Sequence, residues 1–278
     1  MALNSVNTNT GAMIALASLN KTNDALAVTQ KRVSTGYRVA DAKDDGAAFA
    51  VAQSVRADIA GLTSANEQMG GTKGVLDTTM AGLTKVSTAM ADMKTVLVKL
   101  ADETLSTDQR TQYQTQYSSL RTQMQNFVSD AVYNGRTLLS TATASGGGNI
   151  ATTRNETGTT YTLSAVDGST NLIVATVPTS AAAAQAALGS SGDFATKMAS
   201  INTALNTFGN DSKYLDSQIS YNKEKIDSLD SGIGALVDAD LAKESARLQA
   251  LQIRQQLGTQ SLGMANQAPQ SLLSLFRG

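Results

Sequence analysis

The chain contains no cysteine and no histidine in its 278 residues. Without cysteine it forms no disulfide and offers no thiolate chemistry, and it can fold equally well in a reducing or an oxidising environment. Without histidine it lacks the side chain that most often serves as general base or metal ligand. Both absences weigh against an enzyme.

Aromatic residues and prolines are also scarce. Aromatic residues make up 4% of the chain, with no tryptophan, whereas hydrophobic residues make up 41%. Alanine, leucine, valine, isoleucine and methionine therefore supply most of the packing, which is typical of long helices that meet at short range. The two prolines are Pro178 and Pro269, so no proline interrupts a helix in the first 177 residues.

Charge and hydropathy give no indication of a nucleic-acid partner or of membrane insertion. The 22 basic and 23 acidic residues leave a net charge of −1, without a basic patch for nucleic acid or anionic lipid. No apolar run reaches the length of a membrane span. The first residues lack a basic segment followed by an apolar one, so we expect no Sec signal peptide and, for any secretion, another route.

Apolar residues recur at helical spacing close to both ends of the chain. Residues 1–35 are predicted to form one helix, and a similar stripe runs from Leu241 almost to the last residue. Termini usually fray, so stripes that reach both ends indicate a partner that covers them. The two end helices could pair with each other, but a single helix pair buries little surface. We therefore expect other copies of the chain to be the main partner.

Nine apolar residues of these end stripes are the predicted inter-subunit contacts. They are Leu16, Leu19, Leu26, Val33, Leu248, Leu251, Leu262, Leu272 and Phe276. In the free chain, such stripes bury too little surface to offset the loss of backbone entropy, so we expect them to become ordered on assembly.

The longest heptad pattern lies between the ends. Val55, Leu62, Met69, Leu76, Leu83, Met90 and Leu97 are spaced by seven, and they predict a coiled-coil helix from residue 46 to 100, about 80 Å long. Three glycines within it, Gly70, Gly71 and Gly74, predict close packing or a bend. A second stripe runs from Leu215 to Leu236. The predicted rod core comprises Leu62, Met69, Leu76, Leu83, Met90, Leu97, Leu229 and Leu236.

Turn and cap signals divide the rest of the chain. Ser106 followed by Gln109 is a capping box, and Asn134-Gly135 is a stop signal for the helix that this box begins. Residues 149–177 are rich in Thr, Val and Ile. They predict strands at 159–164 and 171–177, with Asp167-Gly168 as the hairpin turn. The alanine run at 181–187 is either a helix start or a spacer, and helix resumes near Asp193.

These elements predict a mainly α fold. It is a long antiparallel helical bundle or coiled coil built from both chain ends, with a small β-hairpin insert in the middle. We expect three parts: a terminal helical domain of residues 1–40 and 240–278, a rod domain of residues 41–140 and 190–239, and the insert at residues 141–189.

No group of residues predicts catalysis, a metal or a cofactor. Asp41, Asp44 and Asp45 form the one tight carboxylate cluster, but Lys43 breaks the alternation that a calcium loop needs. Capping of the next helix is the favoured interpretation. The chain has no phosphate-binding glycine motif, and its methionines at 69, 90 and 93 lie on the core stripe.

Several segments resemble the bacterial flagellins. Residues 33–47 are similar to the signature near the N-terminus of that family, and residues 134–139 resemble its Asn-Gly…Leu-Leu turn. The C-terminal segments that resemble flagellins are 238–244, Leu257, 265–267 and 272–276. The resemblance covers residues 1–140 and 190–278, and the short insert is similar to that of compact alphaproteobacterial flagellins.

The resemblance implies a structural subunit that self-assembles into the extracellular flagellar filament for swimming. It implies export of the unfolded chain by the flagellar type III apparatus, without a cleaved signal. The terminal helices would form the inner tube and the helical hairpin the next shell. The implied partners are further copies of the chain, paralogous flagellins, the export apparatus and an export chaperone that binds the C-terminal helix.

One segment departs from the pattern that an innate immune receptor recognises in other flagellins. Within residues 83–92, Ser87 stands where that pattern has arginine, and Ala91-Asp92 replaces Val-Gln. We therefore predict no receptor activation. Two alternatives to a filament subunit are a hook–filament junction protein, which shares the end motifs, and a cytoplasmic signalling coiled coil. The latter would need neither the insert nor the apolar ends.

Overall fold

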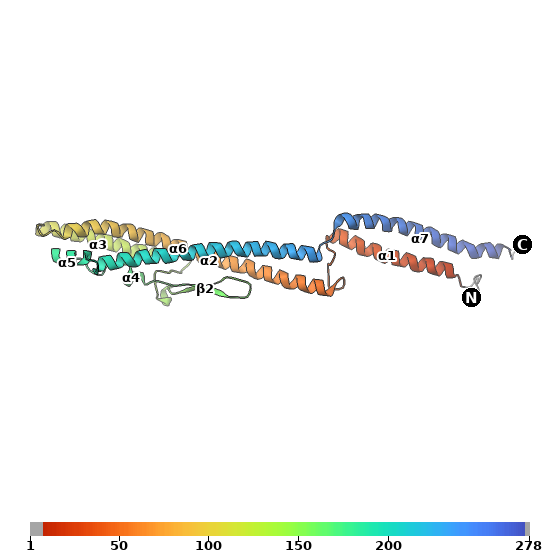
Figure 1. The fold of residues 1–278 in the computed structure, drawn as a ribbon, viewed down its shortest axis with the longest axis horizontal. Helices are drawn as coiled ribbons and strands as arrows, with labels where there is room; N and C mark the ends of the chain where they lie inside the picture. The colour runs from red at the N-terminus through yellow and green to blue at the C-terminus, as the bar shows by residue number, and fades with distance from the viewer. Residues whose placement is uncertain (1–7, 276–278) are drawn as a thin grey trace. The chain divides into compact units, whose positions relative to one another are not determined.

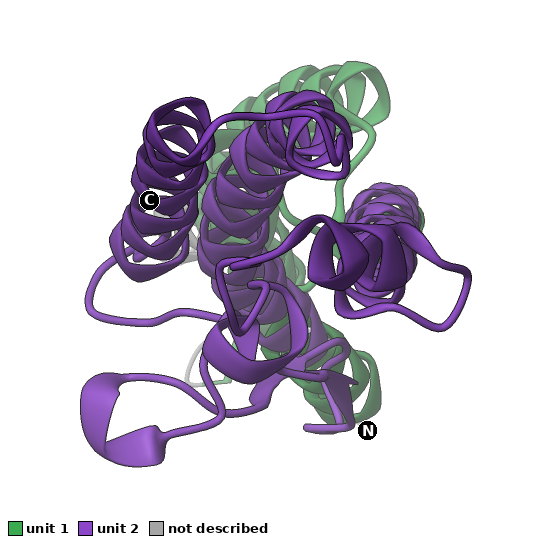
Figure 2. Cartoon of the chain, turned by 90° about the vertical axis from the view of Figure 1, so that its left-hand side faces the viewer, with its two compact units in different colours: residues 1–57, 228–278 green, residues 58–227 purple. Residues whose placement is uncertain are grey.

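The computed structural model describes residues 8–275, with side chains described for residues 8–267, and most of them are helical. The chain divides into two compact units, unit 1 (residues 1–57 and 228–278) and unit 2 (residues 58–227) (Figure 2). The border falls inside two long helices rather than at a loop. Within the described part, no helix is both long and apolar enough to cross a bilayer.

Unit 1 contains the two terminal helices, α1 (Thr10–Thr35) and α7 (Leu241–Leu275), which lie side by side (Figure 1). Helix α1 begins at Thr10 because the Asn9 side chain caps it, accepting a hydrogen bond from the Ala12 amide at 3.0 Å. It ends at Gly36, whose φ of +76° is readily adopted only by glycine. The helix predicted over residues 1–35 thus begins at Thr10 in the described part of the chain. Residues 1–7 lie outside that part.

Two long helices, α2 (Gly46–Leu100) and α6 (Asp193–Val237), run through both units. The bounds of α2 are those that the heptad pattern predicts. Asp45 caps the N-terminus of α2, because one of its carboxylate oxygens accepts hydrogen bonds from the amides of Ala47 and Ala48 at 3.1 Å each. Helix α6 begins at Asp193, where the sequence indicated that helix resumes.

In unit 2, α2 and α6 pack with α3 (Thr107–Asp130) around an apolar core (Figure 1). Six of the eight rod-core residues are fully buried there: Leu62, Met69, Leu76, Leu83, Met90 and Leu97. Ser106 and Gln109 form the predicted capping box, with both reciprocal hydrogen bonds present at 3.1 and 3.3 Å. The α2–α3 helical hairpin therefore forms as its sequence signals indicate.

The insert between α3 and α6 differs from its prediction. Strand β1 (Ile150–Thr153) pairs antiparallel with β2 (Thr160–Leu163), so residues 154–159 form the turn. The predicted strand at 171–177 is wrong. Asp167 instead caps the short helix α4 (Gly168–Asn171), accepting from the amides of Ser169 and Thr170. The apolar run that follows, residues 172–174, is buried in the core without a strand partner. The alanine run forms a helix, α5 (Ala181–Leu188).

The prediction that Asn134-Gly135 stops the preceding helix is wrong, because these residues form a separate turn beyond its end. Helix α3 ends at Asp130, and Asn134 and Gly135 have φ values of +49° and +75°. Two successive positive φ angles make a tight two-residue turn, which Asn-Gly favours. Tyr133 and Arg136 close it with two backbone hydrogen bonds of 2.9 Å. The turn places the Tyr133 ring against Gly74 of α2, where a Cβ would lie 2.8 Å from the ring.

The glycines of α2 therefore differ in how closely other residues pack against them, and two alanine substitutions test this difference. Gly70→Ala should raise the stability of unit 2 by about 1 kcal/mol, because alanine favours helix and nothing lies within 4 Å of the new Cβ. Gly74→Ala should lose this gain, because the new methyl group displaces the Tyr133 ring. Urea denaturation of both variants measures the difference. Equal stabilisation by both substitutions would contradict the close packing at Gly74.

A buried polar contact attaches the β1–β2 hairpin to helices α2 and α6 of unit 2. The Asn222 side chain, 1% exposed, donates to Asn66 Oδ1 and to the carbonyl oxygen of Arg154, both at 2.9 Å. Lys225 of α6 also forms an ion pair with Glu156 in the hairpin turn, at 2.6 Å. An asparagine in an apolar stripe favours one register of the helices, because any slip leaves its amide unpaired.

Candidate assembly surface

The terminal helices α1 and α7 contact each other along their length, through few fully buried side chains. Among the side chains described on the two helices, those below one-tenth exposed are Thr22, Thr29, Glu244 and Leu251. Polar contacts also cross the pair: Asn9 Nδ2 donates to the carbonyl of Ala265 at 2.7 Å, and Gln255 donates to Asn23 Oδ1 at 2.8 Å. The end helices thus pair with each other, which the sequence indicated only as the lesser option.

The predicted inter-subunit residues lie at different depths in this pair. Leu251 is buried, whereas Leu16 is 47% exposed. The half-buried residues are Leu19, Leu26, Val33, Leu248 and Leu262. The Leu272 side chain and the whole of Phe276 lie outside what the structure describes. The pair therefore covers only part of its own apolar surface.

Large apolar side chains remain exposed on both terminal helices. Ile14 is 72% exposed, and Ile253 and Leu257 are 58% and 57% exposed. Ile14 and Leu257 also line a groove of about 450 Å³ between α1 and α7, together with small residues such as Gly11 and Gly258. Uncovered apolar surface that gathers along a groove marks an interaction site.

Two predicted rod-core residues at the end of α6 belong to unit 1 and are not fully buried. Leu229 is half-buried and Leu236 is 38% exposed, so the prediction for Leu236 is wrong. Ile233 and Val237 occupy the buried positions instead, at 6% and 0% exposure. A four-residue step joins these two, which follows the helical repeat and leaves Leu236 on the neighbouring face.

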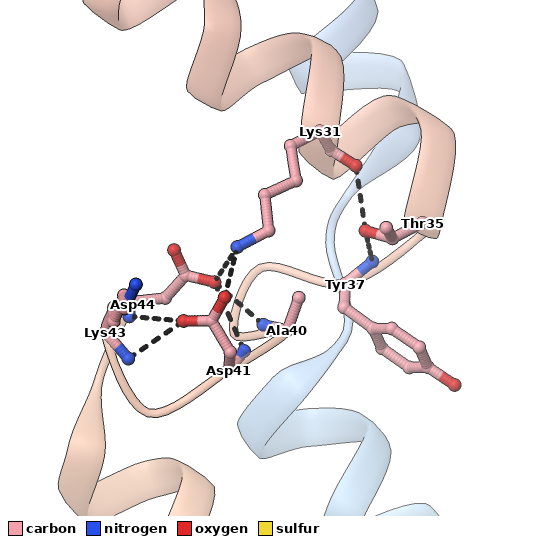
Figure 3. Close-up of polar contacts among 7 residues, drawn as sticks. All are labelled: Lys31, Thr35, Tyr37, Ala40, Asp41, Lys43 and Asp44. Carbon is pink, nitrogen blue, oxygen red and sulfur yellow. Dashed lines mark hydrogen bonds and ion pairs between the residues drawn. The ribbon is translucent and has the colours of Figure 1, made fainter.

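The acidic cluster before α2 holds the connector that follows α1 (Figure 3). The Lys31 ammonium group contacts Asp41 at 2.8 Å and Asp44 at 2.9 Å. The Asp44 carboxylate also accepts from the Ala40 amide at 3.0 Å, and that of Asp41 from the Lys43 amide at 2.8 Å. These carboxylates are thus bonded to an ammonium group and to backbone amides. Of the cluster, Asp45 alone caps α2.

The connector after α6 pairs with the one after α1. The amides of Arg38 and Val39 donate to the Val237 carbonyl at 2.7 and 3.2 Å, and the Ala239 amide donates to the Gly36 carbonyl at 2.9 Å. The Arg38 guanidinium group also donates to the Leu236 carbonyl. These bonds join residues nearly two hundred positions apart in the chain. They fix the C-terminal end of α1 beside the N-terminal end of α7.

The Lys31 contacts predict how acid affects unit 1. The ammonium group lowers the pKa of Asp41 and of Asp44, and the two carboxylates raise the pKa of Lys31. A lowered carboxyl pKa contributes stability above its ordinary value of 3.8, and this contribution is lost as the pH falls through the folded-state pKa. Lys31→Gln should therefore reduce the loss of thermal stability between neutral pH and acid. An unchanged acid dependence of Tm would contradict the arrangement.

Comparison with known proteins identifies the family. Two family models match, the bacterial flagellin N-terminal helical region over residues 6–144 and the C-terminal helical region over residues 192–276. The chain is 36% identical over 277 residues to flagellin FljK of Caulobacter vibrioides, covering 100% of both chains. It is 34% identical over 290 residues to a flagellin of Brucella melitensis, covering 99% of both.

The fold agrees with these relatives. A crystal structure of Bacillus cereus flagellin aligns with 56% of this chain and 88% of its own, with a TM-score of 0.51 and 23% identity, and it supports the fold alone. The two family matches cover both terminal helices and the connectors that pair beside them. The chain belongs to the short bacterial flagellins, which are structural subunits of the flagellar filament and not enzymes.

Proposed function

We propose that this subunit polymerises through the outer face of its α1–α7 pair, which forms the inner tube of the filament. The groove lined by Ile14 and Leu257 carries the proposal, because it leaves large apolar side chains in water on a single subunit. A neighbouring copy would cover them. Since the face of one copy contacts a different face of the next, the interface need not close, and an open helical array results.

The sparse core of the pair supports assembly-dependent ordering. Leu251 is the one large apolar side chain of α1 and α7 that is fully buried among the described residues. Two helices held together by so few buried groups are marginal in water, and most helical stability comes from tertiary packing. Neighbouring subunits would supply the missing contacts, so the pair gains order as it enters the filament.

The remaining partners follow from family membership and from the surface of α7. We propose that the chain leaves the cell through the flagellar export apparatus, with a chaperone covering α7 beforehand. Leu241, Ile253, Leu257 and Met264 are each at least half exposed on that helix. They would otherwise promote polymerisation too early. Paralogous flagellins with a matching terminal pair would enter the same filament.

Electron microscopy of the purified subunit tests polymerisation directly. At raised concentration or raised salt, the subunit should form long tubes, because salt strengthens apolar association. A hook–filament junction protein would instead be present in few copies in sheared filaments, and a signalling coiled coil would sediment as a small closed oligomer. Closed oligomers or unchanged monomers under all these conditions would contradict the proposal.

A further inference from the structure

The methionines of the chain fall into two groups that differ in exposure. Those of unit 2 are either fully buried in its core or half-buried against it: Met69, Met90, Met93 and Met124 in the first case, Met80 and Met198 in the second. Met13 of α1 and Met264 of α7 are instead 62% and 66% exposed. The accessible thioethers among the described residues therefore lie on the two terminal helices.

Met264 continues the exposed apolar stripe of α7. Ile253, Leu257 and Met264 follow one another at steps of four and seven residues, which keep successive side chains on one face of a helix. All three are more than half exposed. A neighbouring copy that covers Leu257 in the filament therefore covers Met264 as well.

Met13 has the corresponding position on α1. The helical repeat places Leu16 and Val28 about 60° to either side of it, and both of these side chains are exposed. Ile14, which lines the groove between the two helices, directly follows Met13 in the chain. A polar group introduced at Met13 would therefore lie in the middle of the apolar surface of α1.

We propose that Met13 and Met264 are oxidation sites through which peroxide prevents assembly of the subunit. This inference rests on the proposed polymerisation surface. In the reaction the thioether sulfur attacks one peroxide oxygen, the O–O bond breaks as the S–O bond forms, and water leaves after proton transfer. The sulfur loses two electrons, which reduce the peroxide, and the product is a sulfoxide.

The sulfoxide makes the assembly surface polar without entering the core of unit 2. Its oxygen accepts hydrogen bonds, so covering it with apolar side chains of a neighbouring copy is unfavourable. In the soluble subunit the same oxygen faces water, and the fold tolerates it. In filaments, the neighbouring copies shield both thioethers. Filaments therefore resist a peroxide concentration that stops soluble subunits from assembling.

Peptide mass spectrometry measures which methionines react. The full-length soluble subunit is treated with hydrogen peroxide for increasing times, and free methionine stops the reaction. Met13 and Met264 should be modified at least roughly tenfold faster than the four buried methionines, which peroxide reaches only when unit 2 opens. The same treatment of preformed filaments should leave both thioethers largely unmodified. Equal rates at all six positions, or equal rates in subunit and filament, would overturn the proposal.

Sedimentation of polymer after the same treatment measures the effect on assembly. Oxidation should raise the concentration needed for polymerisation roughly tenfold or more. The variant Met13→Leu/Met264→Leu should polymerise normally and become insensitive to peroxide, because leucine fills a similar volume and has no sulfur. The matched control Met80→Leu/Met198→Leu should remain as sensitive as the parent chain. Unchanged assembly of the oxidised parent, or lost assembly of oxidised Met13→Leu/Met264→Leu, would overturn the proposal.

The untreated subunit distinguishes this inference from the proposed function. If the untreated subunit forms no filaments, the proposed function is contradicted, and this inference is contradicted with it. If treated and untreated subunits polymerise equally, only the oxidation sites are contradicted. Met1, which lies outside the described residues, is present in every variant. Insensitivity of Met13→Leu/Met264→Leu therefore assigns the effect to these two positions. Circular dichroism of the treated subunit checks that unit 2 remains folded.

Discussion

Replacing Ile14 and Leu257 together with aspartate should abolish filament formation and leave a folded, soluble subunit. Both side chains are more than half exposed, so the substitutions remove little from the single subunit. In the filament each aspartate would enter an apolar contact. Losing an apolar side chain there costs about 1.5–3 kcal/mol, and burying an unpaired carboxylate costs several kcal/mol more.

The expected rise in the concentration needed for polymerisation is large. A loss of about 3 kcal/mol per contact corresponds to roughly a hundredfold, and each subunit carries both changes. Sedimentation of polymer from subunit over a concentration series measures it. Gln256→Glu is the control for the charge added at Leu257, since it adds one negative charge at the neighbouring exposed position and removes no apolar surface. Normal filaments from the double aspartate variant would contradict the assigned surface.

Phe208→Ala should destabilise unit 2 by about 3–5 kcal/mol, because truncating a buried aromatic ring leaves a cavity as well as losing its burial. The Phe208 ring on α6 is fully buried in the same apolar cluster as Leu83 and Met90. Chemical denaturation followed by circular dichroism measures the loss. Tyr221→Ala, at a position of α6 that is 59% exposed, should change stability by no more than about 0.5 kcal/mol.

A loss at Phe208 as small as that at Tyr221 would mean that the cluster does not stabilise unit 2. With so few aromatic residues in the chain, the Phe208 ring fills a volume that the aliphatic side chains around it cannot replace. The substitution should leave the α1–α7 contact intact, because neither terminal helix belongs to unit 2. Hydrogen exchange of the α1 and α7 amides, measured in this variant and in the parent subunit, checks that.

Local sequence patterns predict the parts of the fold that depend on neighbours in the chain. The seven-residue spacing predicts the bounds of α2, and the Ser106–Gln109 pair predicts the start of α3. Both depend on groups within a turn or two of each other, so the residues that decide them are adjacent in sequence. Six residues of the α2 stripe are fully buried for the same reason.

Other features depend on partners that are distant in sequence. The run at 172–174 has the composition of a strand, but it fills the core of unit 2 and finds no ladder partner. Asn134-Gly135 was predicted to stop a helix, but it forms a separate turn, which places Tyr133 against Gly74 of α2. The pairing of the two connectors leaves no local pattern, because Gly36 and Ala239 meet only in the folded chain.

The candidate surface was predictable in outline and not in its polar details. The end stripes predict that something covers α1 and α7, and the structure shows that each helix partly covers the other. Leu236 falls outside the buried stripe because a seven-residue count drifts from the helical repeat. The ion pair between Arg32 and Glu244, at 3.1 Å, could not be predicted from the sequence. Charged residues in the end turns of helices are usually solvated.

Hydrogen exchange of the backbone amides tests the central claim most directly. The claim is that α1 and α7 are loosely held in the single subunit and become the best-covered part of the filament. Their amides should exchange faster than those of the buried α2 stripe in soluble subunit, and they should slow by orders of magnitude in filaments. The same rates for α1 and α7 in both states would contradict the account.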